Sequence, residues 1–315
     1  MIMKANVTLS DIAKEANVAV KTASKVFNGD DSVRPYIKDH VLKIAERLNY
    51  RPNPIAQALR AKSLKIISVS LPELETPFFG ALFQDIYTQF NDKGFLVVPC
   101  RYIDAINNAN STIYACATIL CSTDKNDIYK LVQKGPVLTI NGNKASSNLA
   151  SNLSFDFKSA YSLITEKVLS RGLKKIAIYC THASKINYEM KFTHIDSYLK
   201  EAGVRLVTPE TEKYFSDFNT IVERYRKKDI NAVFCSNDID ALLFLSELQH
   251  NGIRVPEDVL VVGCDGSYIL DYLWTITFDT KKVAALVVNL IVNELNDNRK
   301  HKLAVYSPKV HAPDF

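Results

Sequence analysis

The stretch VTLSDIAKEANVAVKTASKVFN, residues 7–28, decides the fold of the N-terminal part of the chain. Thr8 and Asp11 have the spacing of a helix N-cap and its third residue, so one helix is expected to start directly after Thr8. The short segment 17–19 separates this helix from a second one at 20–27. Two short helices at this spacing are typical of a helix-turn-helix, whose second helix enters the major groove of DNA.

A third helix is predicted from residue 35, because Pro35 suits the first turn and apolar residues recur after it at helical spacing. The outward side of the second helix carries Val20, which can contact a thymine methyl, and Lys21 and Lys25, which can donate to guanine. Short donors suited to phosphate oxygens follow the same helix: Thr22, Ser24 and Asn28. A plain three-helix bundle with solvated lysines is the alternative that this pattern leaves open.

The charge of the chain is concentrated at this end. Residues 1–65 hold 12 Lys and Arg against 6 Asp and Glu, which leaves 27 against 28 in the remainder. A basic head on a neutral body indicates a polyanionic partner, although a solvated basic surface would have the same composition. The overall composition, 47% hydrophobic and 23% charged, excludes fibrous and disordered classes.

The segment RPNP at 51–54 separates the head from the body. Asn53 can cap a helix and Pro54 can occupy its first position, so a short helix is expected at 55–60. Such a helix is too short to be stable alone in water. We therefore divide the chain into a DNA-binding headpiece at 1–52, a hinge helix or linker at 53–63, and a body at 64–315.

The body alternates apolar strand-like runs with helical patterns, which is typical of βαβ units in parallel sheets. One set of runs comprises KIISVSL, FLVVPC, ATILC and PVLTI, and a second comprises KKIAIYC, VRLVT, NAVFC and DVLVVGC. Two α/β lobes follow from these sets, the first at about 64–154 plus 279–300 and the second at about 155–278. Ligands bind such sheets at the carboxyl ends of the strands, so the cleft between two facing lobes is the expected effector site.

The headpiece sequence resembles the lactose/galactose-repressor family, also called LacI/GalR, over about 60 contiguous residues. The motifs that carry the resemblance are VTLSDIA, TASKVFN, LNYRPN and AQAL. The resemblance implies a homodimer on a pseudo-palindromic operator. It also implies that Leu59 wedges between base pairs in the minor groove with Arg60 beside it, where an apolar wedge unstacks and bends the duplex. The chain departs from the family at Ala19, where a serine usually caps the recognition helix, a loss of about 1 kcal/mol.

The body is similar to the family's two-lobed, periplasmic-binding-protein-like core. The stretch 232–267 contains NDIDA, GIRVPED and GCD, which match the family's signature of the second lobe. The resemblance implies that Asp265 accepts hydrogen bonds from the effector and that Asp238 faces the cleft. The structural alternatives are a turn residue for Asp265 and a helix N-cap for Asp238.

Three further residues are candidates for effector binding through the same resemblance. Phe78 and Phe79 follow the first strand of the body, where an aromatic ring can stack on a sugar, although core packing is equally consistent with either ring. Lys191 stands where the family has an arginine. An arginine guanidinium can donate to two oxygens at once, whereas a lysine ammonium presents one compact charge. The first lobe is also short between residues 100 and 117, which makes its effector geometry harder to predict than that of the second lobe.

Other function classes lack their motifs. The chain shows no secretion signal, no apolar run of membrane-spanning length and no phosphate-binding loop, zinc-protease motif or nucleophile elbow. The six cysteines form no CxxC pair, and no cofactor, metal or catalytic residue is predicted. We expect a cytoplasmic, non-enzymatic, dimeric repressor with a helix-turn-helix headpiece, a hinge helix and a two-lobed α/β core. Its effector is expected to be a small polar metabolite, a sugar rather than a nucleobase; the alternative is a cytoplasmic sugar-binding protein or enzyme of similar fold without an operator.

Overall fold

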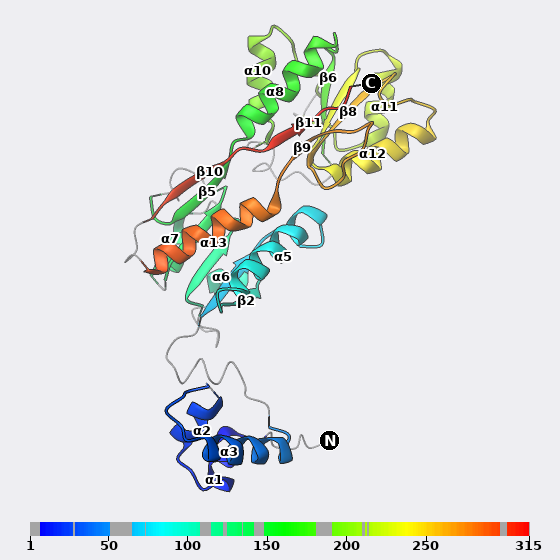
Figure 1. Ribbon diagram of the computed structural model, residues 1–315. Helices are drawn as coiled ribbons and strands as arrows, with labels where there is room; N and C mark the ends of the chain where they lie inside the picture. Colours follow the sequence, from blue (N-terminus) through cyan, green and yellow to red (C-terminus); the bar gives the residue numbers. More distant parts are fainter. Residues whose placement is uncertain are drawn as a thin grey trace. The chain divides into compact units, whose positions relative to one another are not determined.

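The computed structural model describes residues 7–27, 29–50, 65–72, 74–107, 115–121, 125–133, 135–141, 148–180, 191–209, 212, 214–296 and 301–314. The chain divides into two compact units, Met1–Lys65 and Ile66–Phe315 (Figure 1). The predicted hinge helix at 55–60 and the RPNP segment before it lie outside the described residues. The proposed boundary at residue 63 lies there as well.

The described part of the first unit folds as the helix-turn-helix pattern predicts. Its helices are α1 (Leu9–Glu15), α2 (Val20–Phe27) and α3 (Pro35–Arg47). The capping box at the start of α1 is confirmed, since the side chain of Thr8 accepts from the backbone N–H of Asp11 and the Asp11 carboxylate accepts from that of Thr8. All three helices contribute to one small core, whose buried members include Ile12, Ala23 and Val41.

The second unit contains two sheets. The first has the strand order β10-β5-β4-β3-β1-β2, with all pairs parallel. Its strands are β1 (Ile66–Ser70), β2 (Leu96–Pro99), β3 (Ala117–Leu120), β4 (Val137–Ile140), β5 (Ser151–Phe155) and β10 (Leu303–Tyr306). Helices α5 (Pro77–Asn91) and α13 (Thr280–Asn296) lie side by side against one face of this sheet (Figure 1). A smaller apolar cluster joins α6 (Tyr102–Asn107) and α7 (Lys125–Val132) to the sheet.

The second sheet has the order β11-β9-β8-β7-β6. Its strands are β6 (Ile176–Tyr179), β7 (Ala232–Cys235), β8 (Leu260–Asp265), β9 (Trp274–Thr277) and β11 (Lys309–His311), the last of which pairs antiparallel with β9. Helices α8 (Phe157–Ser170) and α10 (Thr193–Glu201) share one apolar cluster with this sheet. Helices α11 (Phe218–Arg226) and α12 (Asp238–His250) share the other, so both faces are covered.

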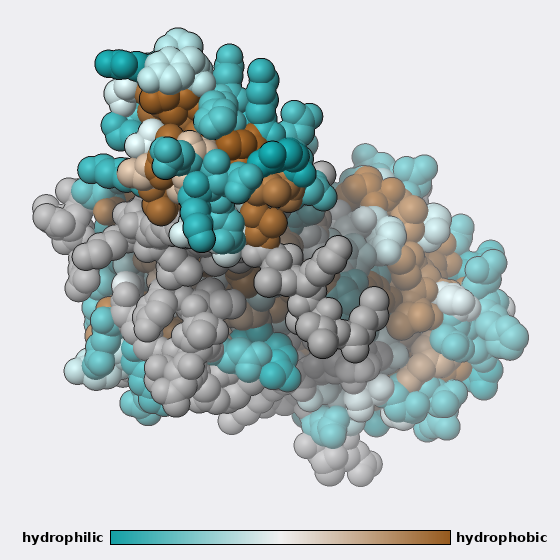
Figure 2. Space-filling model, turned by 90° about the horizontal axis from the view of Figure 1, so that it is seen from below, coloured by the Kyte–Doolittle hydropathy of each residue, from teal (hydrophilic) through white to brown (hydrophobic). Residues whose placement is uncertain are grey.

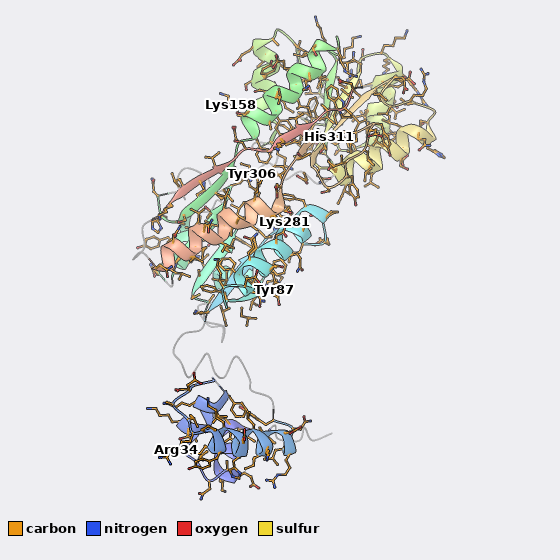
Figure 3. All side chains as sticks on the ribbon, in the orientation of Figure 1. Arg34, Tyr87, Lys158, Lys281, Tyr306 and His311 are labelled. Atoms are coloured by element: carbon orange, nitrogen blue, oxygen red, sulfur yellow. The ribbon has the colours of Figure 1, made fainter. Side chains whose placement is uncertain are left out.

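The chain passes between the two sheets three times, after β5, after β9 and after β10. Aromatic rings connect these passages: Phe278 lies 5.0 Å from Phe155 between ring centroids and stacks on Tyr306 at 6.0 Å. The Tyr306 hydroxyl also accepts from the backbone N–H of Asp279, and Figure 3 shows Tyr306 where β10 ends. One aromatic cluster thus holds the three passages together.

The structure differs from the sequence-based expectation in two places. The run VRLVT was predicted as a strand, which is wrong, because it forms only an isolated bridge between Val207 and Ala177. The third passage was not anticipated, because the predicted first lobe ended at residue 300 while β10 at Leu303–Tyr306 pairs with β5. Short edge strands such as β10 bury only one side, so their apolar pattern is weak.

Candidate functional site

The outward face of α2 is the candidate DNA-contacting surface. Ala23 and Val26 are buried in the headpiece core, whereas Val20 is 42% exposed and Lys21 is exposed. Of the predicted phosphate donors, Thr22 and Ser24 are half-buried beside this face, while Asn28 lies outside the described residues. Figure 2 shows mainly hydrophilic side chains over the described surface of the face in view, with hydrophobic residues between them.

The start of α2 lacks a side-chain cap. The backbone carbonyl of Ala19 accepts from the N–H groups of Thr22 and Ala23 at 2.8 and 3.1 Å, which closes the first turn. Alanine has no side-chain oxygen to accept from the free N–H groups of that turn. The first turn of α2 therefore has the backbone carbonyl of residue 19, and no side-chain oxygen of that residue, as its acceptor.

The other end of α2 is held by ionic contacts. The Lys25 ammonium lies 3.2 Å from a carboxylate oxygen of Asp30 and donates to the Ser32 hydroxyl at 2.8 Å. Hydrogen bonds from Ser32, with a further contribution from Lys25, lower the pKa of Asp30 to about 2, so this carboxylate is charged at neutral pH. Of the two candidate base-reading lysines, Lys25 is therefore already paired within the headpiece. Leu59 and Arg60, the candidates for the minor groove, lie outside the described residues.

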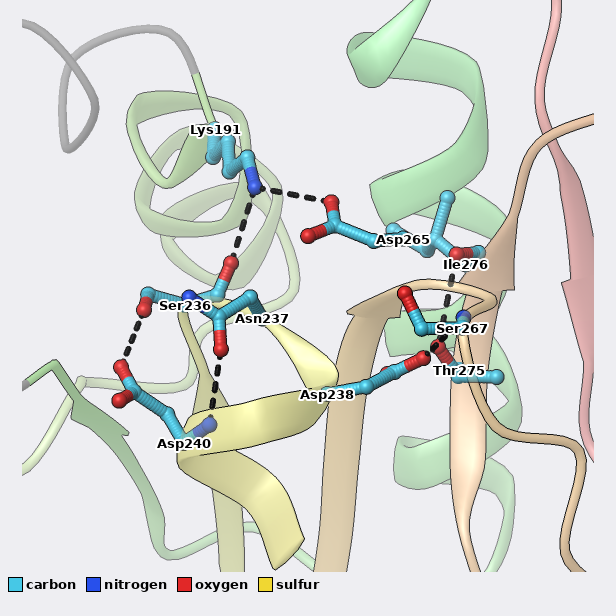
Figure 4. Close-up of polar contacts among 9 residues, drawn as sticks. All are labelled: Lys191, Ser236, Asn237, Asp238, Asp240, Asp265, Ser267, Thr275 and Ile276. Carbon is cyan, nitrogen blue, oxygen red and sulfur yellow. Dashed lines mark hydrogen bonds and ion pairs between the residues drawn. The ribbon is translucent and has the colours of Figure 1, made fainter. Parts of the chain in front are cut away.

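The candidate effector residues of the second lobe meet at the carboxyl ends of β7 and β8 (Figure 4). Asp265 is the last residue of β8, and its carboxylate lies 3.3 Å from the Lys191 ammonium. The same ammonium donates to the backbone carbonyl of Ser236 at 2.9 Å, directly after β7. Lys191 and Asp265, two separately predicted effector candidates, are thus brought together from positions 74 residues apart in the sequence.

Lys191 is charged in this setting. Burial is the largest single effect and would lower its pKa, but the charge and hydrogen bond of Asp265, together with smaller contributions from Cys264, raise the pKa of Lys191 above its ordinary value. Its ammonium also lies 5.9 Å from the centroid of the Phe157 ring, within the range of a cation–π contact. The backbone of Asp265 has φ of 102°, a conformation that side chains rarely adopt and that is typical of functional sites.

Asp238 lies close by but is occupied by structural contacts. Asp238 is only 1% exposed. Its carboxylate accepts from the Thr275 hydroxyl at 2.6 Å and from the backbone N–H groups of Ser267 and Tyr268. The alternative of an N-cap is wrong for Asp238, because Asn237 caps α12 by accepting from the backbone of Asp240. Asp238 instead holds the turn that follows Asp265.

The GCD motif has a packing explanation. A Cβ added at Gly263 would lie 2.2 Å from a carboxylate oxygen of Asp238, so the side chain of Asp238 occupies the space over β8 that only glycine leaves free. Burial, with a smaller contribution from the charge of Asp265, raises the pKa of Asp238 to about 6, while the Thr275 hydroxyl opposes this shift. The turn directly after Asp265 is therefore held by Asp238, which is itself fixed by Thr275 and accommodated by Gly263.

The two phenylalanines do not join this group. Phe78 is 6% exposed and packs in the core of the first lobe, with its ring 5.0 Å from Phe79 and 5.2 Å from Phe278. This placement favours the core alternative for Phe78, while Phe79 is half-buried at the edge of the same core. Sequence reasoning missed Phe157, since nothing in its local pattern marks a ring that lies beside a lysine 34 residues later.

Two kinds of feature are absent from the described ranges. In the residues that the structure describes, no three His, Cys, Asp or Glu side chains gather in a way that could bind a metal ion. No helix in the same part of the chain combines the length and apolar character needed to span a membrane.

Comparisons with known proteins identify two domains of the chain. Residues 8–53 match the model of bacterial regulatory proteins of the lacI family. The chain carries a lacI-family DNA-binding domain. Residues 165–312 also match the model of a periplasmic binding protein-like domain, so both the resemblance and the predicted fold class are confirmed.

Similar curated proteins cover most of the chain. Catabolite control protein A of Staphylococcus epidermidis is 24% identical over 307 residues, which cover 92% of this chain and 93% of that protein. The protein of the same name from Staphylococcus xylosus is 26% identical over 277 residues, 84% of each chain.

Solved structures agree on the fold. The lac repressor dimer bound to operator and the anti-inducer ONPF superposes with a TM-score of 0.81 at 20% identity, covering 98% of each chain. The complex of the transcriptional regulator CelR with cellobiose has a TM-score of 0.65 at 20% identity, covering 98% of this chain and 99% of that one. At these identities the likeness shows the fold of this chain.

Proposed function

We propose that this protein is an operator-binding transcriptional repressor whose affinity for DNA is set by a small polar metabolite, a sugar or sugar derivative rather than a nucleobase. The observation that carries the proposal is α2, which turns Val20 and Lys21 outward from a headpiece matched by the lacI-family model. An exposed helix with a lysine and an apolar residue fits the donor, acceptor and methyl pattern of the major groove.

The protein acts as a homodimer in this proposal. A two-fold pair of headpieces reads two half-sites of a pseudo-palindromic operator, as in the lac repressor dimer bound to its operator. Leu59, with Arg60 beside it, enters the central minor groove and wedges between base pairs. The bend that such a wedge causes costs a few kcal/mol, which added contacts offset.

The effector binds beside Lys191 and Asp265, between the two lobes. Sugar hydroxyls can donate to the Asp265 carboxylate and accept from the Lys191 ammonium, so this pair serves one hydroxylated ligand from two sides. The cellobiose complex of CelR supports a sugar over a nucleobase.

Ligand binding is coupled to DNA through the three passages between the lobes. Effector binding changes the closure of the lobes about the aromatic cluster of Phe155, Phe278 and Tyr306. Closure in turn alters the spacing of the two hinge segments across the dimer, and a hinge helix that is marginal alone folds only when that spacing suits DNA. The ligand needs only to bind one closure state better than the other.

We place the protein in the cytoplasm, where its operator lies, and assign it no enzymatic activity. Two experiments test the proposal. Footprinting on the upstream region of its own gene should show a symmetric protected site, and the absence of protection at low salt would remove the DNA-binding role. Calorimetry with a panel of sugars, sugar phosphates and nucleosides should yield a ligand whose binding depends on Asp265. Undiminished affinity in Asp265→Asn would reject the proposed effector site.

A further inference from the structure

The loop between α2 and α3 returns to the end of the recognition helix. The backbone N–H of Asp30 donates to the carbonyl of Lys25 at 3.0 Å, and that of Gly29 donates to the carbonyl of Val26 at 3.2 Å. Gly29 has φ of +71°, the left-handed conformation that ends a helix and reverses the chain. The turn therefore brings the side chain of Asp30 back to Lys25, the same residue whose carbonyl accepts from the Asp30 N–H.

The carboxylate of Asp30 is fixed in that place. One of its oxygens accepts from the backbone N–H of Ser32 at 2.8 Å, and the other lies 3.2 Å from the Lys25 ammonium. The ammonium completes the ring by donating to the Ser32 hydroxyl at 2.8 Å. Because the loop backbone orients the carboxylate, the lysine is held by a preset acceptor rather than by a second freely rotating side chain.

We propose that Asp30 determines the specificity of DNA binding by holding the Lys25 ammonium away from the phosphate backbone. The inference rests on the proposed function as an operator-binding protein. It adds an acidic positioning residue outside the recognition helix to the basic residues that contact DNA.

Lys25 contributes differently to operator binding and to binding of arbitrary DNA. Binding to arbitrary sequence depends on lysines and arginines that displace counterions from phosphates. A lysine already paired with a carboxylate contributes less to that term, because its charge is locally compensated. At the operator, two guanine acceptors in fixed positions can replace the contacts to Asp30 and Ser32. Asp30 therefore weakens non-specific binding more than operator binding.

The adjacent residue offers a matched control. Asp31 lies 3.2 Å from the ammonium of Lys38, which belongs to α3 and not to the recognition helix. Asp30→Asn and Asp31→Asn remove the same charge from the same loop, but only the first releases Lys25. Asparagine at position 30 retains an oxygen that can accept from the Ser32 N–H, so the turn itself is preserved.

The test compares two duplexes of equal length with the full-length protein. One is selected from a random library by the wild-type protein, and the other is its scrambled sequence. Asp30→Asn should raise affinity for the scrambled duplex about three- to fivefold and that for the selected duplex less than twofold. The slope of log affinity against log salt on the scrambled duplex should steepen by about one. Asp31→Asn should change both affinities by the same factor and leave their ratio as in the wild type.

Two further variants separate charge from loop structure. In a Lys25→Ala background, Asp30→Asn should no longer change the ratio of the two affinities. Asp30→Glu retains the charge and should keep the wild-type ratio. An unchanged ratio in Asp30→Asn, an equal change in Asp31→Asn, or a ratio shift that persists without Lys25 would each overturn the inference. If the wild type selects no duplex at all, the proposed function fails instead, so the two failures are distinguishable.

Discussion

The ammonium of Lys191 lies 3.3 Å from the carboxylate of Asp265, and the two residues lie at the carboxyl ends of the strands where a ligand is expected. The side chains are only 17% and 16% exposed, so water screens the pair weakly. Lys191 has a second fixed contact, the Ser236 carbonyl, and the backbone of Asp265 is fixed as the last residue of β8, in register with Thr277 of β9. In this structure the two effector candidates therefore satisfy each other.

Removing either member of this pair should destabilise the protein, because the remaining charge loses its partner in a largely dry site. We expect Lys191→Met and Asp265→Asn each to lower the free energy of unfolding of the body by about 2–3 kcal/mol, and the double variant to lose less than the sum. Urea denaturation followed by circular dichroism measures all four members of the cycle. Additive losses would show that the pair is not energetically coupled.

Asp238 should make stability depend on pH. Burial raises the pKa of Asp238 to about 6, above the ordinary carboxyl value, so the folded protein binds this proton more tightly than the unfolded chain. The stabilisation of the folded state by this proton is fully present below pH of about 4 and is lost as pH rises through about 6. The free energy of unfolding changes by about 2–3 kcal/mol over that range. Asp238→Asn should flatten this part of the stability curve.

Asp238→Asn is a suitable comparison because asparagine can form hydrogen bonds with the same groups. Its carbonyl can accept from the N–H groups of Ser267 and Tyr268, and its amide can donate to the Thr275 hydroxyl with the roles of the two groups reversed. The difference between wild-type and Asp238→Asn unfolding free energies, measured from pH 4 to 7, removes the titration of all other groups. A constant difference across that range would contradict the raised pKa.

Gly263 should not tolerate a methyl group. A Cβ at this position would lie 2.2 Å from an Asp238 oxygen, so Gly263→Ala forces the carboxylate away from Thr275 and the turn after Asp265. We expect a loss of about 2–3 kcal/mol. Gly172→Ala is the control, because Gly172 has φ of +76° with no atom within 4 Å of an added Cβ and tests backbone strain alone. Equal decreases in stability for the two variants, measured by thermal melts, would refute the steric explanation.

The sequence predicts the parts of this fold that depend on local patterns. The capping pair Thr8 and Asp11, the apolar runs of β1 to β4 and the motif ending in Asp265 all follow from short spacings. The role of Asp238 does not, because its partners Ser267 and Thr275 lie 29 and 37 residues away and only the sheet order brings them together. The contact of Lys25 with Asp30 does not follow from the sequence either, because helical spacing places Lys25 on α2 but gives no position for a side chain in the loop after it.

Restoring the cap of the recognition helix should stabilise the headpiece. A serine at position 19 can accept from the backbone N–H of Thr22, which now contacts only the Ala19 carbonyl in that turn. Ala19→Ser should raise the stability of α2 by about 1 kcal/mol. Hydrogen exchange of the α2 amides in the full-length protein measures this locally, with the amides of α12 as an internal reference. Unchanged protection of α2 would mean that the turn is already limited by another contact.

Leu59 provides the sharpest test of how operator and non-operator DNA are distinguished. If Leu59 wedges between base pairs only when the duplex bends at the operator, Leu59→Ala should lower affinity for a selected duplex about tenfold or more. Affinity for the scrambled duplex, which depends on phosphate contacts, should change less than twofold. Ile55→Ala removes an apolar side chain from the same segment and controls for a general loss of hinge structure. Equal losses on both duplexes, or equal effects of the two variants on the selected duplex, would assign Leu59 to the folding of the hinge rather than to the minor groove.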